Sequence, residues 1–225
     1  MNRKVTEYFF TLALNAETGY YRVSGNYLSY GVIGAMLMDL ALNNRIELDG
    51  KSLKIKDSSI SGIPAYDKML EAISTSPKER AIRHWLRKFA FKASWYRKEM
   101  QKLLVNNGIL KMERRRFIGI PYSLYFPASI SDTDRLKYRL KDIVLYNKQA
   151  EEHELMFLGL AYACRMHRSM AKESHERRLI RKALVKYIKD NPLASGVSKT
   201  IIEMQVAITA SVSAAVIASS SSSST

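Results

Sequence analysis

Few side chains in this sequence have the types and the spacing that acid–base, nucleophilic or metal chemistry requires. The four histidines show no shared spacing of metal ligands, and there is no Gly-rich phosphate loop, nucleophile elbow or His-Glu-x-x-His motif. Asp132 and Asp134 suggest a divalent-metal pair, but they open a predicted helix, where acidic side chains favour the helix dipole. We therefore predict no enzyme activity, no cofactor and no metal site, which leaves binding as the function.

Two other groups with reactive side chains are also predicted to be structural. Cys164 is the single cysteine, so an internal disulfide is excluded and a reducing compartment is expected. It lies in the apolar run GLAYACRMH, which predicts a buried, unreactive thiol. The segment EEHE, residues 151–154, is predicted to be a solvated turn of a helix.

The net charge of +15 is concentrated in two segments of the 225-residue chain. Residues 1–77 carry eight basic and eight acidic side chains, which cancel. Residues 78–116 carry thirteen basic and three acidic side chains, a net charge of +10, and residues 165–189 carry nine and two, a net charge of +7. Charge localised in this way predicts an anionic partner, either nucleic acid or an anionic bilayer surface. A merely solvated basic face is the alternative.

The hydrophobic pattern predicts a mostly α-helical fold, a single domain over residues 1–218 with short β-hairpins and a disordered Ser-rich tail over 219–225. Residues 27–44 are apolar on almost every face, and Gly31 and Gly34 permit close helix approach, so this is the central buried helix. Thr6 is expected to cap the first helix. Further helices are predicted over residues 74–104 with a break near Ala93-Ser94, and over 129–149, 151–170, 175–190 and 198–218.

Short β-hairpins are predicted at two places. Residues 46–55 alternate apolar and polar side chains around Asp49-Gly50, a strong hairpin signal. The segment LALNNRIEL (40–48) is echoed by LLVNNGIL (103–110), and each copy predicts a helix that ends at Asn-Asn and runs into a strand. The second copy leads into RRRFIGIPYSLYFPASIS (114–131), which is therefore predicted to complete a second hairpin.

The second hairpin discriminates between the two kinds of anionic partner. After its three arginines it carries no formal charge until Asp132, and it is rich in aromatic and aliphatic side chains. A DNA-binding wing requires Lys, Arg, Asn or Ser at its tip, whereas a bilayer interface favours aromatic and aliphatic residues beside arginines. A winged-helix DNA-binding protein is the alternative function, and packing in a core or a homodimer contact stays open for the hairpin itself.

The preferred interpretation is peripheral binding to anionic phospholipid on the cytosolic face of a membrane, without nucleic acid and with no identified protein client. The predicted headgroup-binding residues are basic: Arg97, Lys92, Lys98, Arg114, Arg115 and Arg116. The predicted membrane-inserting residues lie on the hairpin: Phe117, Ile118, Ile120, Tyr122, Leu124, Tyr125 and Phe126. No apolar run reaches the roughly eighteen residues that a membrane span needs, and the start of the chain is predicted to be a helix rather than a targeting segment.

Four segments give the chain a resemblance to the Golgi phosphoprotein 3 family. They are TEYFFTLAL…ETGYY (6–21), SYGVIGAMLMDLALNNRIEL (29–48), WYRKEMQKLLVNNGILKMERRRFIGIP (95–121) and LMFLGLAYACRM (155–166). The resemblance covers nearly the whole chain, and the small-residue helix that runs into LALNNRIEL is its most specific part. Because the chain lacks the long acidic N-terminal extension of eukaryotic members, it looks like a minimal, prokaryotic-type member.

The resemblance implies a helical domain around a central hydrophobic helix, with a basic face for phosphatidylinositol 4-phosphate and a hydrophobic hairpin that inserts into the membrane at about residues 116–126. In eukaryotes the family bridges Golgi membranes to cytoplasmic tails of glycosyltransferases. The family's headgroup pocket uses a Trp, an Arg and an Arg-x-x-Arg pair, and these positions are occupied here by Ser24, Ile33, Ser94 and Arg97. Since only Arg97 is retained, weak discrimination among anionic lipids is expected.

Overall fold

The computed structural model describes residues 1–225 except 3, 24, 172, 191–198 and 222–225. The helices of this described part are α1 (Lys4–Ala13), α2 (Gly25–Leu42), α3 (Pro64–Ser74), α4 (Ile82–Ala90), α5 (Ala93–Asn106), α6 (Ile130–Tyr146), α7 (Glu152–Ala163), α8 (His167–Met170), α9 (Ser174–Asp190) and α10 (Lys199–Ser221). Its strands are β1 (Ile46–Asp49), β2 (Ser52–Ile55), β3 (Arg80–Ala81), β4 (Leu110–Phe117) and β5 (Ile120–Pro127). The predicted fold class, mostly α with short hairpins, is confirmed.

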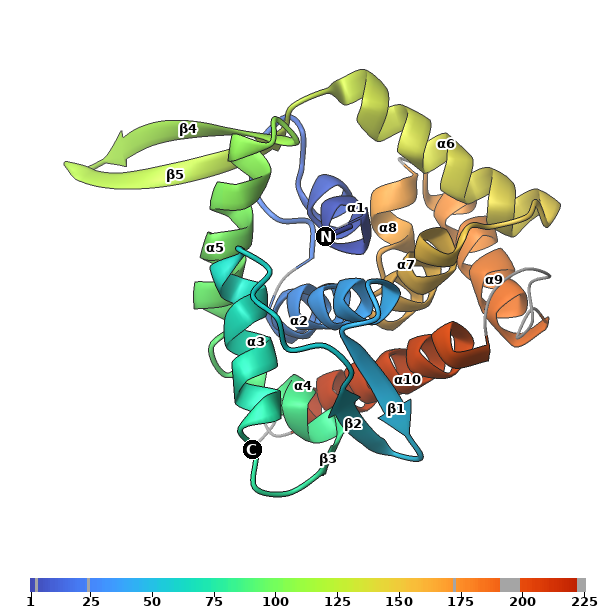
Figure 1. Cartoon of the computed structure of the whole chain (residues 1–225). Coiled ribbons are helices and arrows are strands. Elements are labelled where there is room, and N and C mark those ends of the chain that lie inside the picture. The colour runs from blue at the N-terminus through green and yellow to red at the C-terminus, as the bar shows by residue number, and fades with distance from the viewer. Residues whose placement is uncertain (3, 24, 172, 191–198, 222–225) are drawn as a thin grey trace.

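Helix α2 lies at the centre of the molecule, as its apolar sequence predicts (Figure 1). It packs against α1, α4, α5, α7 and α10, so nearly every face of it is covered by another helix. Two glycines allow the closest of these approaches. A Cβ atom at Gly31 would lie 2.4 Å from the Phe9 ring, and one at Gly34 would lie 2.9 Å from Leu160. Larger residues at these positions would force the helices apart.

Both predicted hairpins are present, and both follow a helix that ends at the repeated Asn-Asn or Asn-Asn-Gly. At the end of α2 the Arg45 N–H donates to the Leu40 carbonyl (2.9 Å), with Asn44 in the left-handed region at φ 53°. At the end of α5 the Ile109 N–H donates to the Leu104 carbonyl (2.9 Å), with Gly108 at φ 72°. This is the same C-terminal cap in both copies, and it turns each helix into a strand.

The two sheets differ in what surrounds them. Strands β1 and β2 pair antiparallel around Gly50, and β3 pairs with β2 to complete a three-stranded sheet beside α3 and α10. Strands β4 and β5 form a separate two-stranded sheet that projects away from the helical body (Figure 1). We call this second hairpin, residues 110–127, the arm.

The N-terminus of α1 is capped by a residue from another helix, so the prediction that Thr6 is the cap is wrong. Helix α1 already begins at Lys4, and Thr6 lies inside it, fully buried. The carboxylate of Asp39, in the middle of α2, accepts hydrogen bonds from the N–H groups of Val5 (3.0 Å) and Thr6 (3.1 Å). It also accepts one from the Tyr66 hydroxyl of α3 (2.8 Å), so a single buried carboxylate joins three helices.

The segment at residues 151–154 is structural, but it is not the solvated turn that was predicted. Glu151 and Glu154 form a capping box at the start of α7. Glu154 is buried and pairs with Arg139 of α6 through two hydrogen bonds of 2.8 and 2.7 Å, and His153 is buried with its Nε2 3.1 Å from the Tyr8 hydroxyl. The sequence pattern did not show that α6 and α1 cover this turn.

The predicted helix over residues 151–170 is interrupted after Cys164. Helix α7 ends at Ala163, Arg165 takes a left-handed conformation with φ 54°, and the short α8 follows. Cys164 itself is a free, buried thiol, as predicted, and burial raises its pKa. At the C-terminus α10 extends to Ser221, and residues 222–225 of the predicted tail lie outside the described residues.

Candidate membrane-binding surface

Helices α4 and α5 present a basic outer face because their apolar residues recur at helical spacing. On α4, Trp85, Leu86 and Phe89 are buried, whereas Arg87 and Lys88 are exposed. The predicted headgroup residues Lys92, just before α5, and Lys98, on α5, are also exposed. The +10 segment of the sequence therefore forms part of the solvent-accessible surface, where it can attract anions.

Arg97 of α5 is held in place by a tyrosine. Its guanidinium carbon lies 5.6 Å from the centre of the Tyr21 ring, within the range of a cation–π contact. The hydroxyl of Tyr21 accepts a hydrogen bond from the Gln101 side chain (2.9 Å). Burial raises the pKa of Tyr21, and the Arg97 charge and the Gln101 hydrogen bond oppose that rise. Arg97 is consequently half-buried and oriented, unlike the lysines beside it.

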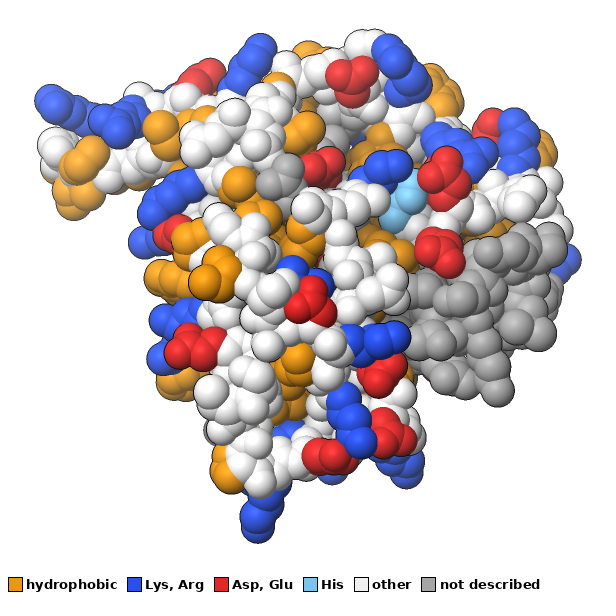
Figure 2. Space-filling view, viewed as in Figure 1, with side chains coloured by type: hydrophobic (Ala, Val, Ile, Leu, Met, Phe, Trp, Pro, Cys, Tyr) orange, Lys and Arg blue, Asp and Glu red, His pale blue; other side chains and the backbone are white. Residues whose placement is uncertain are grey.

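The arm is an antiparallel hairpin of two eight-residue strands, with pairs running from Leu110↔Pro127 to Phe117↔Ile120. Seven residue steps at about 3.4 Å each give it a length of about 24 Å. Every residue of β4 after Leu110 is exposed, so the outer part of the arm does not pack on the helical body. Figure 2 shows basic and hydrophobic side chains together at its outer end.

The tip of the arm combines exposed apolar side chains with exposed arginines. Phe117 is 67% exposed, Ile118 84% and Ile120 70%. Phe117 pairs with Ile120 and Arg115 pairs with Tyr122, and paired side chains share a face of a two-stranded sheet. Apart from Arg115, this face of the tip is therefore largely apolar. Arg114 and Arg116 belong to the opposite face, because successive side chains along a strand alternate.

The base of the arm packs on the body, which changes the role of three residues predicted to insert. Leu124 is only 4% exposed, and Tyr125 packs against the core. A Cβ atom at Gly19 would lie 3.0 Å from the Cβ atom of Leu124 and 2.8 Å from the Phe126 ring. The loop before α2 therefore packs closely against the base of the arm. Leu124 is not available for insertion, because it already fills the junction. Tyr122 is half-exposed between base and tip.

The turn at the tip is strained. Its two central residues, Ile118 (φ 48°) and Gly119 (φ 78°), both have positive φ, as a type I′ turn requires. Gly suits such a position, but a β-branched side chain there is an outlier, and the left-handed conformation costs about 1–2 kcal/mol for an ordinary residue. Asn would be the favoured residue at position 118 for the turn alone. An apolar Ile, 84% exposed and strained, indicates a role other than folding.

Ile118→Asn is therefore expected to separate folding from binding. It creates the Asn-Gly turn, so amide hydrogen exchange across β4 and β5 should slow, which reports a more stable hairpin. Vesicle binding should fall about tenfold because one inserting side chain is lost. Faster exchange, or unchanged vesicle binding, would contradict this account of the tip.

Phe91 was missed by the sequence analysis. It is 90% exposed at the corner between α4 and α5, next to Lys92 and one helical turn after Arg87. The spacing predicts its exposure. Phe91 follows Arg87 by four residues and so shares its outer face, whereas Phe89 continues the buried stripe from Trp85.

Asp132 and Asp134, the two acids that suggest a divalent-metal pair in the sequence, each lie beside a basic side chain of α6. Asp132 pairs with Arg135 (3.4 Å) and Asp134 with Lys137 (2.9 Å), both within the first turns of α6, while Ser129 caps the helix. In the part of the chain that the structure describes, no group of three His, Cys, Asp or Glu side chains is placed to hold a metal ion. The described helices also include none that is long and apolar enough to cross a membrane.

Of the four positions that the family resemblance assigns to the headgroup pocket, the structure describes three. Ile33 is fully buried inside α2, so it has neither the charge nor the access to contact a phosphate. Ser94 is exposed at the start of α5, one turn from the half-buried Arg97. Ser24 lies outside the described residues. Arg97 is thus the one basic side chain at these positions.

The family relationship is shown by a comparison with protein-family models. The model for Golgi phosphoprotein 3 (GPP34) matches residues 6–204, which include the central helix, the basic face, the arm and the helices through the start of α10. The match extends over most of the chain. This chain belongs to the Golgi phosphoprotein 3 family.

Proposed function

We propose that this chain is a peripheral membrane protein that binds anionic phospholipid through the basic face of α4 and α5 and the arginines of the arm, with the arm tip as an apolar anchor. The observation that carries the proposal is the tip itself. Three exposed apolar side chains stand at the end of a 110–127 hairpin, directly beside Arg114, Arg115 and Arg116. An isolated apolar tip flanked by arginines fits the boundary between lipid headgroups and acyl chains.

The two parts of this surface contribute different kinds of free energy. Each basic side chain near an anionic membrane surface contributes about 1 kcal/mol. Each large apolar side chain that leaves water contributes about 1.5–3 kcal/mol. Charge therefore concentrates the protein at the surface, and the tip holds it there. Neither part alone is expected to give stable attachment.

Binding to anionic vesicles is consequently expected to weaken by at least tenfold when salt is raised from 0.1 to 1 M. The Debye length falls from about 10 Å to about 3 Å over that range, so long-range attraction is lost while tip insertion persists. Cosedimentation with vesicles of neutral lipid alone and of neutral plus anionic lipid measures both terms. Equal binding to the two vesicle types would overturn the proposal. A DNA mobility-shift assay on the same protein tests the winged-helix alternative.

A weak preference among anionic headgroups is also expected. Selective recognition of one phosphoinositide needs several fixed donors that converge on a phosphate, and Arg97 is the one basic residue at the four family positions. Arg97→Ala should lower the affinity for phosphatidylinositol 4-phosphate and for other anionic lipids by similar factors, at matched surface charge. Lys102→Ala on the same helix, exposed and paired with Glu99, is the matched control for loss of one charge. A strong preference that Arg97→Ala abolishes would contradict this expectation.

A further inference from the structure

A second cationic site lies on elements that the proposed membrane surface does not use. A cavity of about 290 Å³ opens between the start of α2, the connection from α7 to α8, and helices α9 and α10. Its aromatic and cationic lining includes Tyr27, Tyr162, Arg165, His167, Arg168 and Arg181. We call this cavity the arginine pocket. None of these residues is part of the basic face, of the arm, or of the four headgroup positions of the family.

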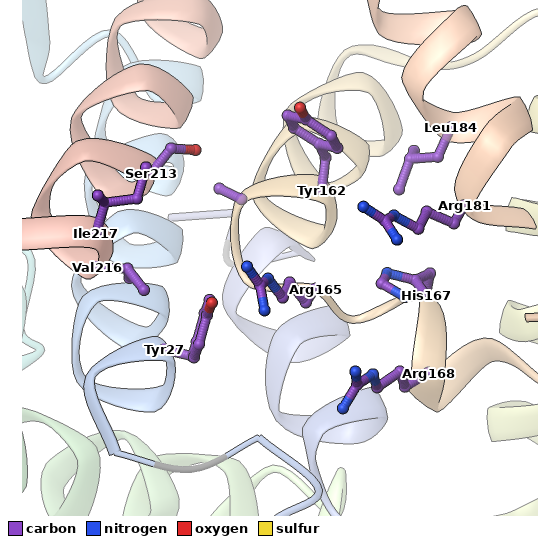
Figure 3. A pocket seen from close by; sticks show the side chains of 11 residues that line it. Tyr27, Tyr162, Arg165, His167, Arg168, Arg181, Leu184, Ser213, Val216 and Ile217 are labelled. Carbon is purple, nitrogen blue, oxygen red and sulfur yellow. The ribbon is translucent and has the colours of Figure 1, made fainter. Parts of the chain in front are cut away.

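The arginine pocket gathers positive charge. Among the residues that the structure describes, its lining includes three arginines and a histidine but no Asp or Glu. Within the described part of the chain, Arg165, Arg168 and Arg181 make no ion pair, whereas the nearby Lys141 pairs with Glu176 and Arg139 pairs with Glu154. Figure 3 shows the three arginine side chains around the pocket, Arg165 from the connection after α7, Arg168 from α8 and Arg181 from α9. Arginines gathered in this way from different elements are typical of a site for an anion.

The backbone around Arg165 is shaped to place its side chain in the arginine pocket. Arg165 has φ 54°, in the left-handed region that side chains other than Gly, Asn and Asp seldom adopt. Its guanidinium carbon lies 5.4 Å from the centre of the Tyr27 ring, which fixes the cation against the wall of the cavity. The planar guanidinium still has free N–H donors, because no acid binds it in the described residues.

His167 reports the electrostatic state of the same cavity. Burial lowers its pKa, and so do the charges of Arg181, Arg168, Arg165 and Arg177, in that order. All four of these charges are positive. Arg177 itself donates to the Ala171 carbonyl (3.0 Å) and does not line the cavity. A bound dianion would reverse the sign of the local field and raise the pKa of His167.

We propose that the arginine pocket binds a phosphate monoester, with Arg165, Arg168 and Arg181 as charge-assisted donors. The phosphate belongs either to a lipid headgroup or to a soluble phosphorylated compound, since both present the same dianion. The pocket is not remote from Arg97 along the chain: Tyr27, which contacts Arg165, follows Tyr21, which contacts Arg97, by six positions, so the Cα atoms of the two tyrosines are at most about 21 Å apart.

The first test uses free phosphate and needs no membrane. Inorganic phosphate and glycerol 3-phosphate are titrated into the full chain while the pKa of His167 is followed by NMR, with chloride at equal ionic strength as reference. The pKa should rise on binding. Arg168→Gln with Arg181→Gln should weaken binding at least tenfold. Arg178→Gln with Lys182→Gln, which removes two exposed charges from α9 outside the cavity, should leave it unchanged. Equal losses in the two variants, or an unchanged pKa of His167, would overturn the proposal.

The second test identifies the source of the phosphate. Vesicles containing phosphatidic acid, a monoester, are compared with vesicles containing phosphatidylglycerol, a diester, at matched surface charge. If the pocket takes a lipid, the Arg168/Arg181 variant loses binding to the monoester vesicles and the Arg178/Lys182 variant does not. If it takes a soluble compound, both variants bind vesicles alike while the free-phosphate titration still separates them. Because that titration contains no lipid, it succeeds or fails independently of the proposed membrane function.

Discussion

Replacing both Ile118 and Ile120 with Asp is expected to lower the affinity for anionic vesicles by about 100-fold or more, with little change in the thermal midpoint. Both side chains are mostly exposed at the arm tip, so the folded chain loses no packing. Each contributes about 1.5–3 kcal/mol if it enters the interface, and each 1.4 kcal/mol is a factor of ten in affinity. The added carboxylates are also repelled by anionic headgroups. Cosedimentation and a melting curve measure the two quantities.

Two control variants make this result specific. Ile60→Asp changes a side chain that is as exposed as Ile118 but lies before α3, away from the arm, and it should leave binding unchanged. Leu124→Asp changes a buried residue of the same strand, and it should destabilise the protein because it places a carboxylate at the junction with Gly19. If the double tip variant unfolds, the tip is core. If it stays folded and changes only the oligomeric state, the tip is a subunit contact.

The central helix and both hairpins were predictable from the sequence because local rules decide them. Residues 27–44 lack a polar face, so only a buried position suits them. The Asn-Asn before Arg45 and the Asn-Asn-Gly before Ile109 form the C-terminal caps of α2 and α5, and the repeat in the sequence made these caps recognisable. These features depend on neighbours within a few residues, and no tertiary information was needed to find them.

The arm illustrates where that reasoning stops. Its apolar residues were correctly grouped, but the sequence does not show how far along the hairpin the helical body reaches. The loop that contains Gly19 covers Leu124 and Phe126, whereas Ile120 on the same strand is exposed to solvent. The boundary between base and tip is set by a contact with residues more than one hundred positions away in the chain. Hydrophobic periodicity and composition therefore do not predict it.

The same limit applies to charge. The +7 segment was visible as a run of basic residues, but the gathering of Arg165, Arg168 and Arg181 depends on the break after Cys164 and on the packing of α9. Thr6 was mistaken for a cap for a related reason. A Thr near a helix start is the usual local cap, and nothing nearby indicates that Asp39 performs that role from another helix.

Asp39 has an effect on stability that depends on pH. Burial raises its pKa to about 7, although the hydrogen bonds from Thr6, Tyr66 and Val5 oppose the rise. The folded state therefore holds this proton at pH values where the unfolded chain has released it. The stability that Asp39 contributes is fully present below its unfolded pKa, near 3.8, and is lost as the pH rises through about 7. Burial lowers the pKa of His84, His153 and His167. These histidines therefore have the opposite effect, and their contribution to stability rises with pH.

Asp39→Ala is accordingly expected to destabilise the protein by about 3–5 kcal/mol at pH 5, since the buried N–H groups of Val5 and Thr6 and the Tyr66 hydroxyl lose their acceptor and a cavity is left. At pH 8 the parent protein is itself destabilised, because it buries an ionised carboxylate. The difference in the free energy of unfolding between the parent and Asp39→Ala should therefore be smaller at pH 8 than at pH 5, by an amount on the order of 2 kcal/mol. Urea unfolding at the two pH values measures both differences. Asp39→Asn, close in shape but unable to titrate, should show the same loss of slope with a smaller penalty. If the parent and Asp39→Asn keep parallel pH profiles, Asp39 does not titrate between pH 5 and 8, and its three donors hold it ionised throughout.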